Sequence, residues 1–127
     1  MKTILLATLM ATGLAAQQKK SADKDNWQRT KECAAQAEKA ANRMDEELIR
    51  NHYSAKYERC FMLTLAKDSD HVFRHTLSDA FEGTLLALTI TDYRKETKPE
   101  DRRACSISDL SNNCSEVEAY IEQHLTE

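Results

Sequence analysis

Glycine and proline are almost absent from this 127-residue chain, which has only two glycines and one proline. Phosphate-binding loops and strained catalytic turns need glycines at fixed spacings, because only glycine adopts their backbone angles without strain. The sequence contains no P-loop, no dinucleotide-binding glycine motif and no G-x-S-x-G elbow. These absences exclude the enzyme classes that depend on those motifs, and we expect no bound cofactor.

An excess of positive charge is also missing. The chain has 18 Lys and Arg against 21 Asp and Glu, interspersed along its length, for a formal net charge of −3 at pH 7. Proteins that bind nucleic acids or anionic membrane surfaces present a strongly basic patch. We therefore expect no nucleic-acid partner and no membrane contact once the N-terminal leader described below has been removed.

Long hydrophobic runs are limited to one short stretch at the N-terminus. Lys2 is followed by an apolar run of about ten residues and then by small residues up to Ala16, which is the layout of a signal peptide. A membrane-spanning helix needs about 20 apolar residues, so a retained membrane helix is the less favoured alternative. We predict that residues 1–16 are a cleaved signal peptide and that the product is exported, either periplasmic or secreted. The first cysteine is Cys33, which does not support a lipoprotein anchor.

Aromatic residues make up only 6% of the chain, so residues 17–127 predict a single small domain with a thin core. Such a domain gains much from covalent cross-links. Because oxidising compartments favour disulfides, we expect the four cysteines of an exported chain to be paired, which leaves no free thiol as a nucleophile. They contain no C-x-x-C pair, so a zinc site is not supported. The four are Cys33, Cys60, Cys105 and Cys114.

The pattern predicts a long helix over 25–50, which starts at an Asp25–Gln28 capping box and is followed by Asn51 as a left-handed C-cap. Its apolar stripe is mostly alanine, which would let a sheet approach closely. The best strand candidate is 57–66, with apolar residues on both faces, as expected for a strand covered on two sides. A helix rises about 1.5 Å per residue and an extended chain about 3.3 Å per residue. If the chain turns back at 51–53, Cys33 before the turn and Cys60 after it therefore lie at the same position along the helix axis. This geometry favours a Cys33–Cys60 disulfide and leaves Cys105–Cys114.

The stretch 72–88 fits either one helix or two strands. Gly83 would cost a helix interior about 1 kcal/mol but supplies a positive φ cheaply in a hairpin turn, so we predict strands at 72–80 and 84–93. A charged surface loop at 94–103 follows, and a closing helix at 115–126 after a Ser115–Glu118 capping box. The predicted fold is α+β: a long N-terminal helix packed on a small three-stranded antiparallel sheet, a short C-terminal helix and two disulfides.

The candidate catalytic residues are two weak pairs: His52 with Tyr53, and His75 with Asp79. Histidine titrates near neutrality and could act as a general acid or base beside a tyrosine or carboxylate. The competing interpretation is that the aromatic residues close one end of the core and that the histidines face solvent. His71, His75 and Asp79 point the same way on a strand, but successive members of this series lie about 13 Å apart, which one metal ion could not bridge, so we predict no metal site.

These observations support two main hypotheses of function. The first is a small exported non-enzymatic binding or interaction module whose partner is an unknown protein or an envelope component. It rests on the small cross-linked core, the mixed-charge surface and the missing catalytic motifs. The second is a small exported hydrolase that uses His52 with Tyr53 or His75 with Asp79. A structural role in an assembly, through the alanine-striped helix, is a third possibility.

Overall fold

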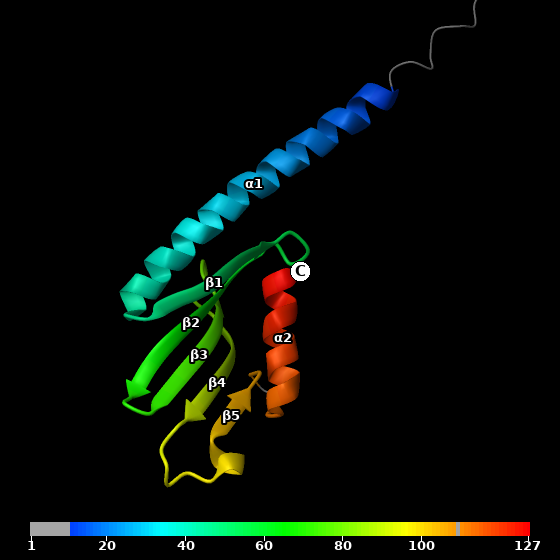
Figure 1. Ribbon diagram of the computed structural model, residues 1–127. Helices are drawn as coiled ribbons and strands as arrows, with labels where there is room; N and C mark the ends of the chain where they lie inside the picture. The colour runs from blue at the N-terminus through cyan, green and yellow to red at the C-terminus, as the bar shows by residue number, and fades with distance from the viewer. Residues whose placement is uncertain (1–10, 109) are drawn as a thin grey trace, which may run out of the picture.

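A computed structural model describes residues 11–108 and 110–127, with side chains from residue 23 onward (Figure 1). The predicted signal peptide falls on residues 1–10, outside the described part, and on the first residues of the N-terminal helix, so it stays a prediction. The fold is α+β, with the sheet between two helices. The elements are α1 (Ala11–Met44), β1 (Glu47–Ser54), β2 (Arg59–Ser69), β3 (Val72–Asp79), β4 (Leu85–Asp92), η1 (Pro99–Asp101), β5 (Arg103–Ser106) and α2 (Cys114–Thr126).

The sheet has five antiparallel strands in the order β1-β2-β3-β4-β5, so the prediction of three strands was wrong. The three expected strands are present as β2, β3 and β4. Gly83 lies in the turn between β3 and β4 with a φ of 72°, as the choice of a hairpin over a helix required.

The first missed strand is β1, of which residues 47–50 had been assigned to the end of the helix and residues 51–53 to a turn. α1 ends at Met44 because Asp45 takes a left-handed backbone conformation, with a φ of 55°. β1 then carries a register shift between Leu48 and Arg50, which interrupts the alternation that marks a strand. Its signal in the sequence was therefore weak.

The second missed strand, β5, is only four residues long and begins within the predicted loop 94–103. It pairs with the outer side of β4, Cys105 facing Thr89. Short edge strands have little periodicity to detect. The loop before it contains the one turn of 3-10 helix, η1, at the only proline.

Both predicted helix caps were wrong. Asp25 lies inside α1, whose backbone is helical from Ala11. α2 begins at Cys114, and the side chain of Asn113 accepts a hydrogen bond from the backbone N–H of Glu116, at 3.2 Å. Glu118, expected to close a capping box with Ser115, instead forms an ion pair with Arg103. Asparagine and serine are both favourable N-caps, so the sequence offered two adjacent choices.

On one face of the sheet, α1 packs through small side chains. Cys33, Ala37 and Ala40 are buried against Cys60 and Met62 of β2. This packing begins only at Cys33, because every side chain from residue 23 to residue 32 is exposed, including Trp27 and Thr30 of the predicted stripe. The alanines do allow the close approach that their size predicts.

The disulfides join the two pairs that the geometry favoured. Cys33 and Cys60 have Cα atoms 5.3 Å apart, although the chain turns back at Asp45 rather than at 51–53. β1 then runs back along α1, so that β2 starts near the height of Cys33. Cys105 and Cys114 link β5 to the first residue of α2, with Cα atoms 5.0 Å apart. Two disulfides indicate an oxidising environment.

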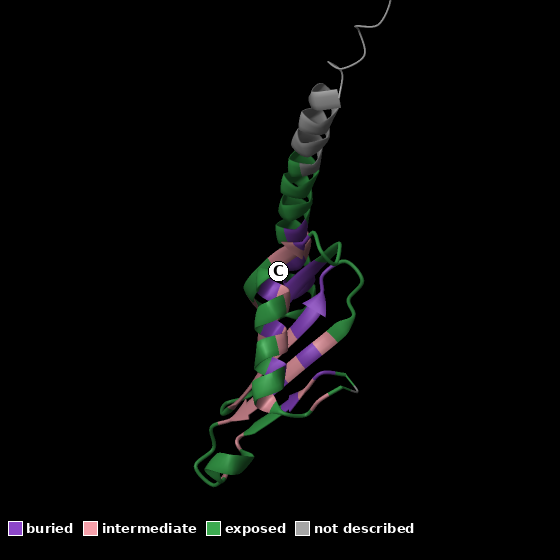
Figure 2. Ribbon diagram, turned by 90° about the vertical axis from the view of Figure 1, so that its right-hand side faces the viewer, coloured by how far each residue is buried: buried purple, intermediate pink, exposed green. Residues whose placement is uncertain are grey.

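On the opposite face, α2 buries Val117, Ile121 and Leu125 against a cluster that includes Phe61 and Leu77. β2 is therefore covered on both faces, as predicted. Figure 2 shows the buried residues gathered where the two helices cross the sheet, while the strand ends beyond α2 are intermediate or exposed. No helix in the described part of the chain is both long and apolar enough to cross a membrane.

Candidate functional site

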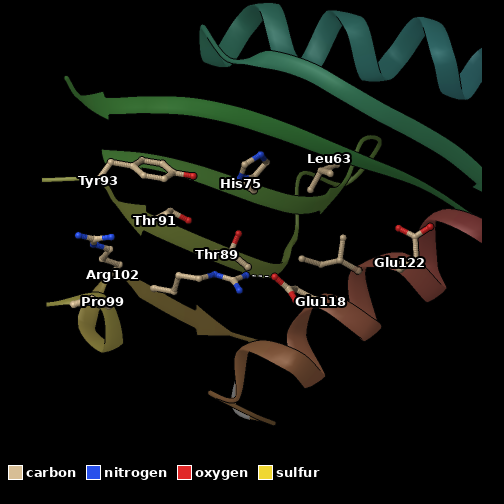
Figure 3. A pocket seen from close by; sticks show the side chains of 11 residues that line it. Leu63, His75, Thr89, Thr91, Tyr93, Pro99, Arg102, Glu118 and Glu122 are labelled. Atoms are coloured by element: carbon tan, nitrogen blue, oxygen red, sulfur yellow. Dashed lines mark hydrogen bonds and ion pairs between the residues drawn. The ribbon is translucent and has the colours of Figure 1, made fainter. Parts of the chain in front are cut away.

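The face of the sheet that α2 occupies is only partly covered. Past α2, the sheet, the loop before β5 and α2 itself enclose an open hollow of about 640 Å³ (Figure 3). Ligand sites in proteins commonly have volumes of about 300–1,000 Å³. We call this hollow the α2 groove. It is lined by Leu63, His75, Thr89, Thr91, Tyr93, Pro99, Arg102, Arg103, Glu118, Ile121 and Glu122.

Polar side chains form much of the floor of the α2 groove. His75 of β3 lies directly opposite Thr89 of β4, and Thr91 follows two residues later on the same face. Tyr93, just beyond β4, lies beside them (Figure 3). The side-chain hydrogen bonds at the groove belong to its walls, and none joins these four floor side chains to another described residue. The floor therefore offers hydrogen-bonding groups that the fold itself does not use.

The wall contributed by α2 is acidic, but its charges are paired. Glu118 accepts from the guanidinium of Arg103 on β5, the contact drawn as a dashed line in Figure 3. Glu122 lies 2.9 Å from Nη1 of Arg50 on β1. Both pairs are partly exposed, so each contributes at most about 1 kcal/mol to stability. Their main effect is to neutralise this wall.

The opposite wall presents Arg102, which a chain of hydrogen bonds positions. Its Nε donates to the carbonyl of Thr97 at 3.4 Å, and the Thr97 hydroxyl donates to Oδ2 of Asp92 at 2.9 Å. Asp92 also accepts from the side chain and the backbone N–H of Arg94, which hold the pKa of its carboxyl well below the ordinary value. The backbone N–H of Asp92 in turn donates to the carbonyl of Arg102, at 2.7 Å. We call residues 92–103 the arginine arm.

His75 and Asp79, one of the predicted pairs, are not brought together. His75 lies in the α2 groove. Asp79 is four residues further along the same strand, about 13 Å away. Its buried carboxylate accepts from the backbone N–H groups of Phe81 and Glu82, at 2.8 and 3.1 Å, and so shapes the β3–β4 turn.

His52 and Tyr53 also fail to converge, because neighbouring residues on a strand point to opposite faces. His52 faces the α2 side, opposite Phe61, and its Nε2 is buried without a hydrogen-bond partner. Tyr53 packs against the α1 cluster. His71 is exposed in the β2–β3 turn. Over the described residues, no group of three His, Cys, Asp or Glu side chains could hold a metal ion.

A second polar–aromatic cluster lies at the C-terminal end of α2. The His124 ring stacks on Tyr57, with centroids 5.1 Å apart, and packs edge-on against Phe61. Its Nδ1 lies 2.7 Å from the carbonyl of Tyr120, to which it donates, and burial raises the pKa of the Tyr120 phenol. These contacts fasten the end of α2 to the β1–β2 turn, and we assign them a structural role.

The sequence analysis identified only one residue of the groove floor, His75. The hydroxyls of Thr89 and Thr91 and the guanidinium of Arg102 were missed. The two threonines alternate with Leu88 and Ile90, a pattern that could have indicated a polar face on β4. Arg102 gave no comparable signal, because its position depends on the folded arm.

Comparisons of the chain with protein-family models, with curated proteins and with solved structures found no match.

Proposed function

We propose that the protein is an exported, non-enzymatic binding module that holds a small polar ligand in the α2 groove. The observation that carries this proposal is the floor of the groove, where the side chains of His75, Thr89, Thr91 and Tyr93 form no hydrogen bond with another described residue. The acidic wall is already neutralised by arginines. A ligand would therefore meet free donors and acceptors on a pre-formed surface, as in typical small-molecule sites.

The alternative, a His-based hydrolase, has less support from the geometry. General acid–base catalysis needs a histidine within hydrogen-bond reach of a group that orients it. His75 makes no hydrogen bond to a described carboxylate, and Asp79 is engaged in the β3–β4 turn. His75 is better suited to contacting a ligand through its ring nitrogens.

Export is part of the same proposal. The two disulfides and the apolar N-terminal run both support a destination in the periplasm or outside the cell. N-terminal sequencing of the protein recovered from the exported fraction should show a start near Ala16 or Gln17. A product that retains Met1 would contradict this part of the proposal.

Ligand binding can be tested by recording amide chemical shifts of the oxidised, ¹⁵N-labelled protein against a small panel. We suggest trigalacturonate, maltotriose, trialanine and glycerol 3-phosphate. At least one member should move the amides of His75, Thr89 and Thr91, while those of Ala37 and Met62 under α1 stay unchanged. Thr91→Val should weaken the response, and Thr84→Val, in the exposed β3–β4 turn, should not. A panel that moves no groove amide would overturn the proposal.

A further inference from the structure

We infer that the ligand of the α2 groove is an acidic saccharide, whose carboxylate binds Arg102 and whose ring hydroxyls bind the floor. This inference rests on the proposed function and assigns a chemical class to its ligand. It follows from three features of the groove: a free guanidinium edge, a set of unpaired hydroxyls and one exposed aromatic ring.

The first feature is the guanidinium of Arg102. Only its Nε is used, in the bond to the carbonyl of Thr97, and no carboxylate of the described residues pairs with it. Nη1 and Nη2 therefore remain available for a planar anion, and an arginine held in one orientation binds a carboxylate with two parallel hydrogen bonds. The hydrogen bonds that Thr97 and Arg94 donate to the carboxylate of Asp92 restrain the Arg102 side chain, through Thr97, before any ligand arrives. Less conformational freedom is then lost on binding.

The second feature is the arrangement of the floor. Directly opposed residues lie about 5 Å apart across two strands, and next-but-one residues lie about 7 Å apart along a strand. His75, Thr89 and Thr91 thus form a grid of groups that can both donate and accept hydrogen bonds. The hydroxyls around a sugar ring are spaced similarly and also donate and accept.

The position of this grid argues against a peptide. Peptides that bind to sheets pair their backbone with a free strand edge. The floor lies on the face of β3 and β4, whose backbone groups are already paired with neighbouring strands. Only side chains can contact a ligand here, and those of His75, Thr89 and Thr91 are polar groups that suit a polyhydroxylated molecule.

The third feature is Tyr93, which is 62% exposed although it lines the α2 groove. Phe73 holds the ring edge-on, with centroids 5.9 Å apart. The C–H face of a sugar packs well on such a ring, while the phenol can still form hydrogen bonds. A second hollow of about 250 Å³, on which Leu65 and Phe73 also border, shares His75, Thr91 and Tyr93 with the groove. The site can therefore extend to more than one sugar unit.

The direct test compares two trisaccharides with the same α-1,4 linkage, one acidic and one neutral, which differ in charge and in the configuration at C4. Trigalacturonate should bind the oxidised protein at least about tenfold more tightly than neutral maltotriose, measured by amide-shift titration. Arg102→Gln should remove that difference, and Tyr93→Ala should weaken both ligands. Arg43→Gln, an exposed arginine at the end of α1, is the matched control and should change neither affinity.

A positioning role for Asp92 predicts a smaller effect. Asp92→Asn should weaken trigalacturonate binding less than Arg102→Gln does and should leave maltotriose unaffected. For each variant, an unchanged midpoint of thermal unfolding and unchanged amide chemical shifts of Ala37 and Met62 under α1 would establish that it is folded.

Three results would overturn the inference. These are equal binding of the two trisaccharides, an Arg102→Gln variant that still prefers the acidic one, and tighter binding of glycerol 3-phosphate or trialanine in the groove. The last result would leave the proposed binding function standing, with a different ligand class. If trigalacturonate changed only amide shifts outside the groove, and no other member of the panel changed a groove amide, both the inference and the proposed binding function would be overturned.

Discussion

The two faces of the sheet are built on opposite plans. Under α1, small side chains meet β1 and β2 closely, a disulfide joins helix to strand, and Glu46 accepts a hydrogen bond from Thr64, although the hydroxyl of Ser78 is buried there without a partner. Under α2, larger side chains form the main core, but beyond the helix the floor of the α2 groove keeps polar groups without partners. α1 also leaves part of its own side uncovered, where Leu88 and Ile90 are half-buried and Leu85 is exposed.

On the function proposed above, this difference separates residues that stabilise the fold from residues that bind a ligand. A polar side chain that the fold needs is bonded within the fold, as Glu46 is to Thr64 and Arg74. Side chains left unpaired in a concave site have no such role, and a ligand is the natural partner for them. The α1 side should therefore respond to mutation through stability and the groove through affinity.

The largest effect is expected from truncation in the core under α2. Leu77→Ala removes a side chain with no exposed surface, so unfolding free energy should fall by about 2–5 kcal/mol because a cavity remains. Leu85→Ala, in the neighbouring strand on the open side, should change it by less than about 0.5 kcal/mol, because that side chain is half exposed. Denaturant unfolding of both variants measures the contrast. Equal losses would show that the α1-side face is covered by something else.

The disulfides should have different consequences. Replacing Cys33 and Cys60 together with alanine should lower stability by about 3.5 kcal/mol in the loop-entropy model and leave groove affinity unchanged. Replacing Cys105 and Cys114 should cost about 2.7 kcal/mol and also weaken groove binding, because this link joins β5 and α2, which carry opposed parts of the groove. Calorimetric unfolding and ligand titration of both variants check this. A loss of affinity in the first variant alone would contradict the comparison.

An intermediate effect is expected at the corner between α1 and β1. The carboxylate of Glu46 is 9% exposed and accepts from the Thr64 hydroxyl at 2.6 Å and from Nη1 of Arg74 at 3.3 Å. Glu46→Gln keeps the shape but loses the charge, so it should cost about 1–3 kcal/mol. Its exposed neighbour provides the control, since Glu47→Gln should be nearly neutral in the same thermal melts.

The smallest effect concerns pH and the arginine arm. The bonds from Arg94 lower the pKa of Asp92, so its contribution is present above the ordinary carboxyl pKa of about 4 and is lost as pH falls toward the lowered value. Because amide shifts follow the protonation of Asp92 in the folded protein, the amides of Arg94 and Thr97 should stay constant through the ordinary carboxyl range at about pH 4 and shift only at lower pH. In Asp92→Asn this acid transition should be missing. A transition near neutrality would assign the control of the arm to another group.

Much of the fold could be predicted from local patterns. A run that is apolar on both faces located β2, the preference of Gly83 for a turn favoured β3 and β4 over a helix, and helix and strand rises paired Cys33 with Cys60 and left Cys105 with Cys114. The error in strand number came from elements whose pattern is disturbed. β1 contains a bulge, and β5 is too short for a period to show.

The α2 groove was harder to predict because it depends on which part of the sheet α2 leaves uncovered. His75 could be singled out by its chemistry, yet its neighbours Thr89 and Thr91 reach it only through strand pairing. The orientation of the Arg102 side chain depends on hydrogen bonds that link it through Thr97 to Asp92, and no short sequence motif indicates these bonds. Pairs chosen by sequence proximity, such as His52 with Tyr53, were separated by the alternation of the strand itself.

The most direct measurement is a crystal structure of the oxidised protein with trigalacturonate. We predict a sugar ring over Tyr93 and a carboxylate oxygen about 2.7–3.2 Å from a terminal nitrogen of Arg102. A trisaccharide bound instead against Leu88 and Ile90, with the α2 groove filled only by solvent, would contradict the account.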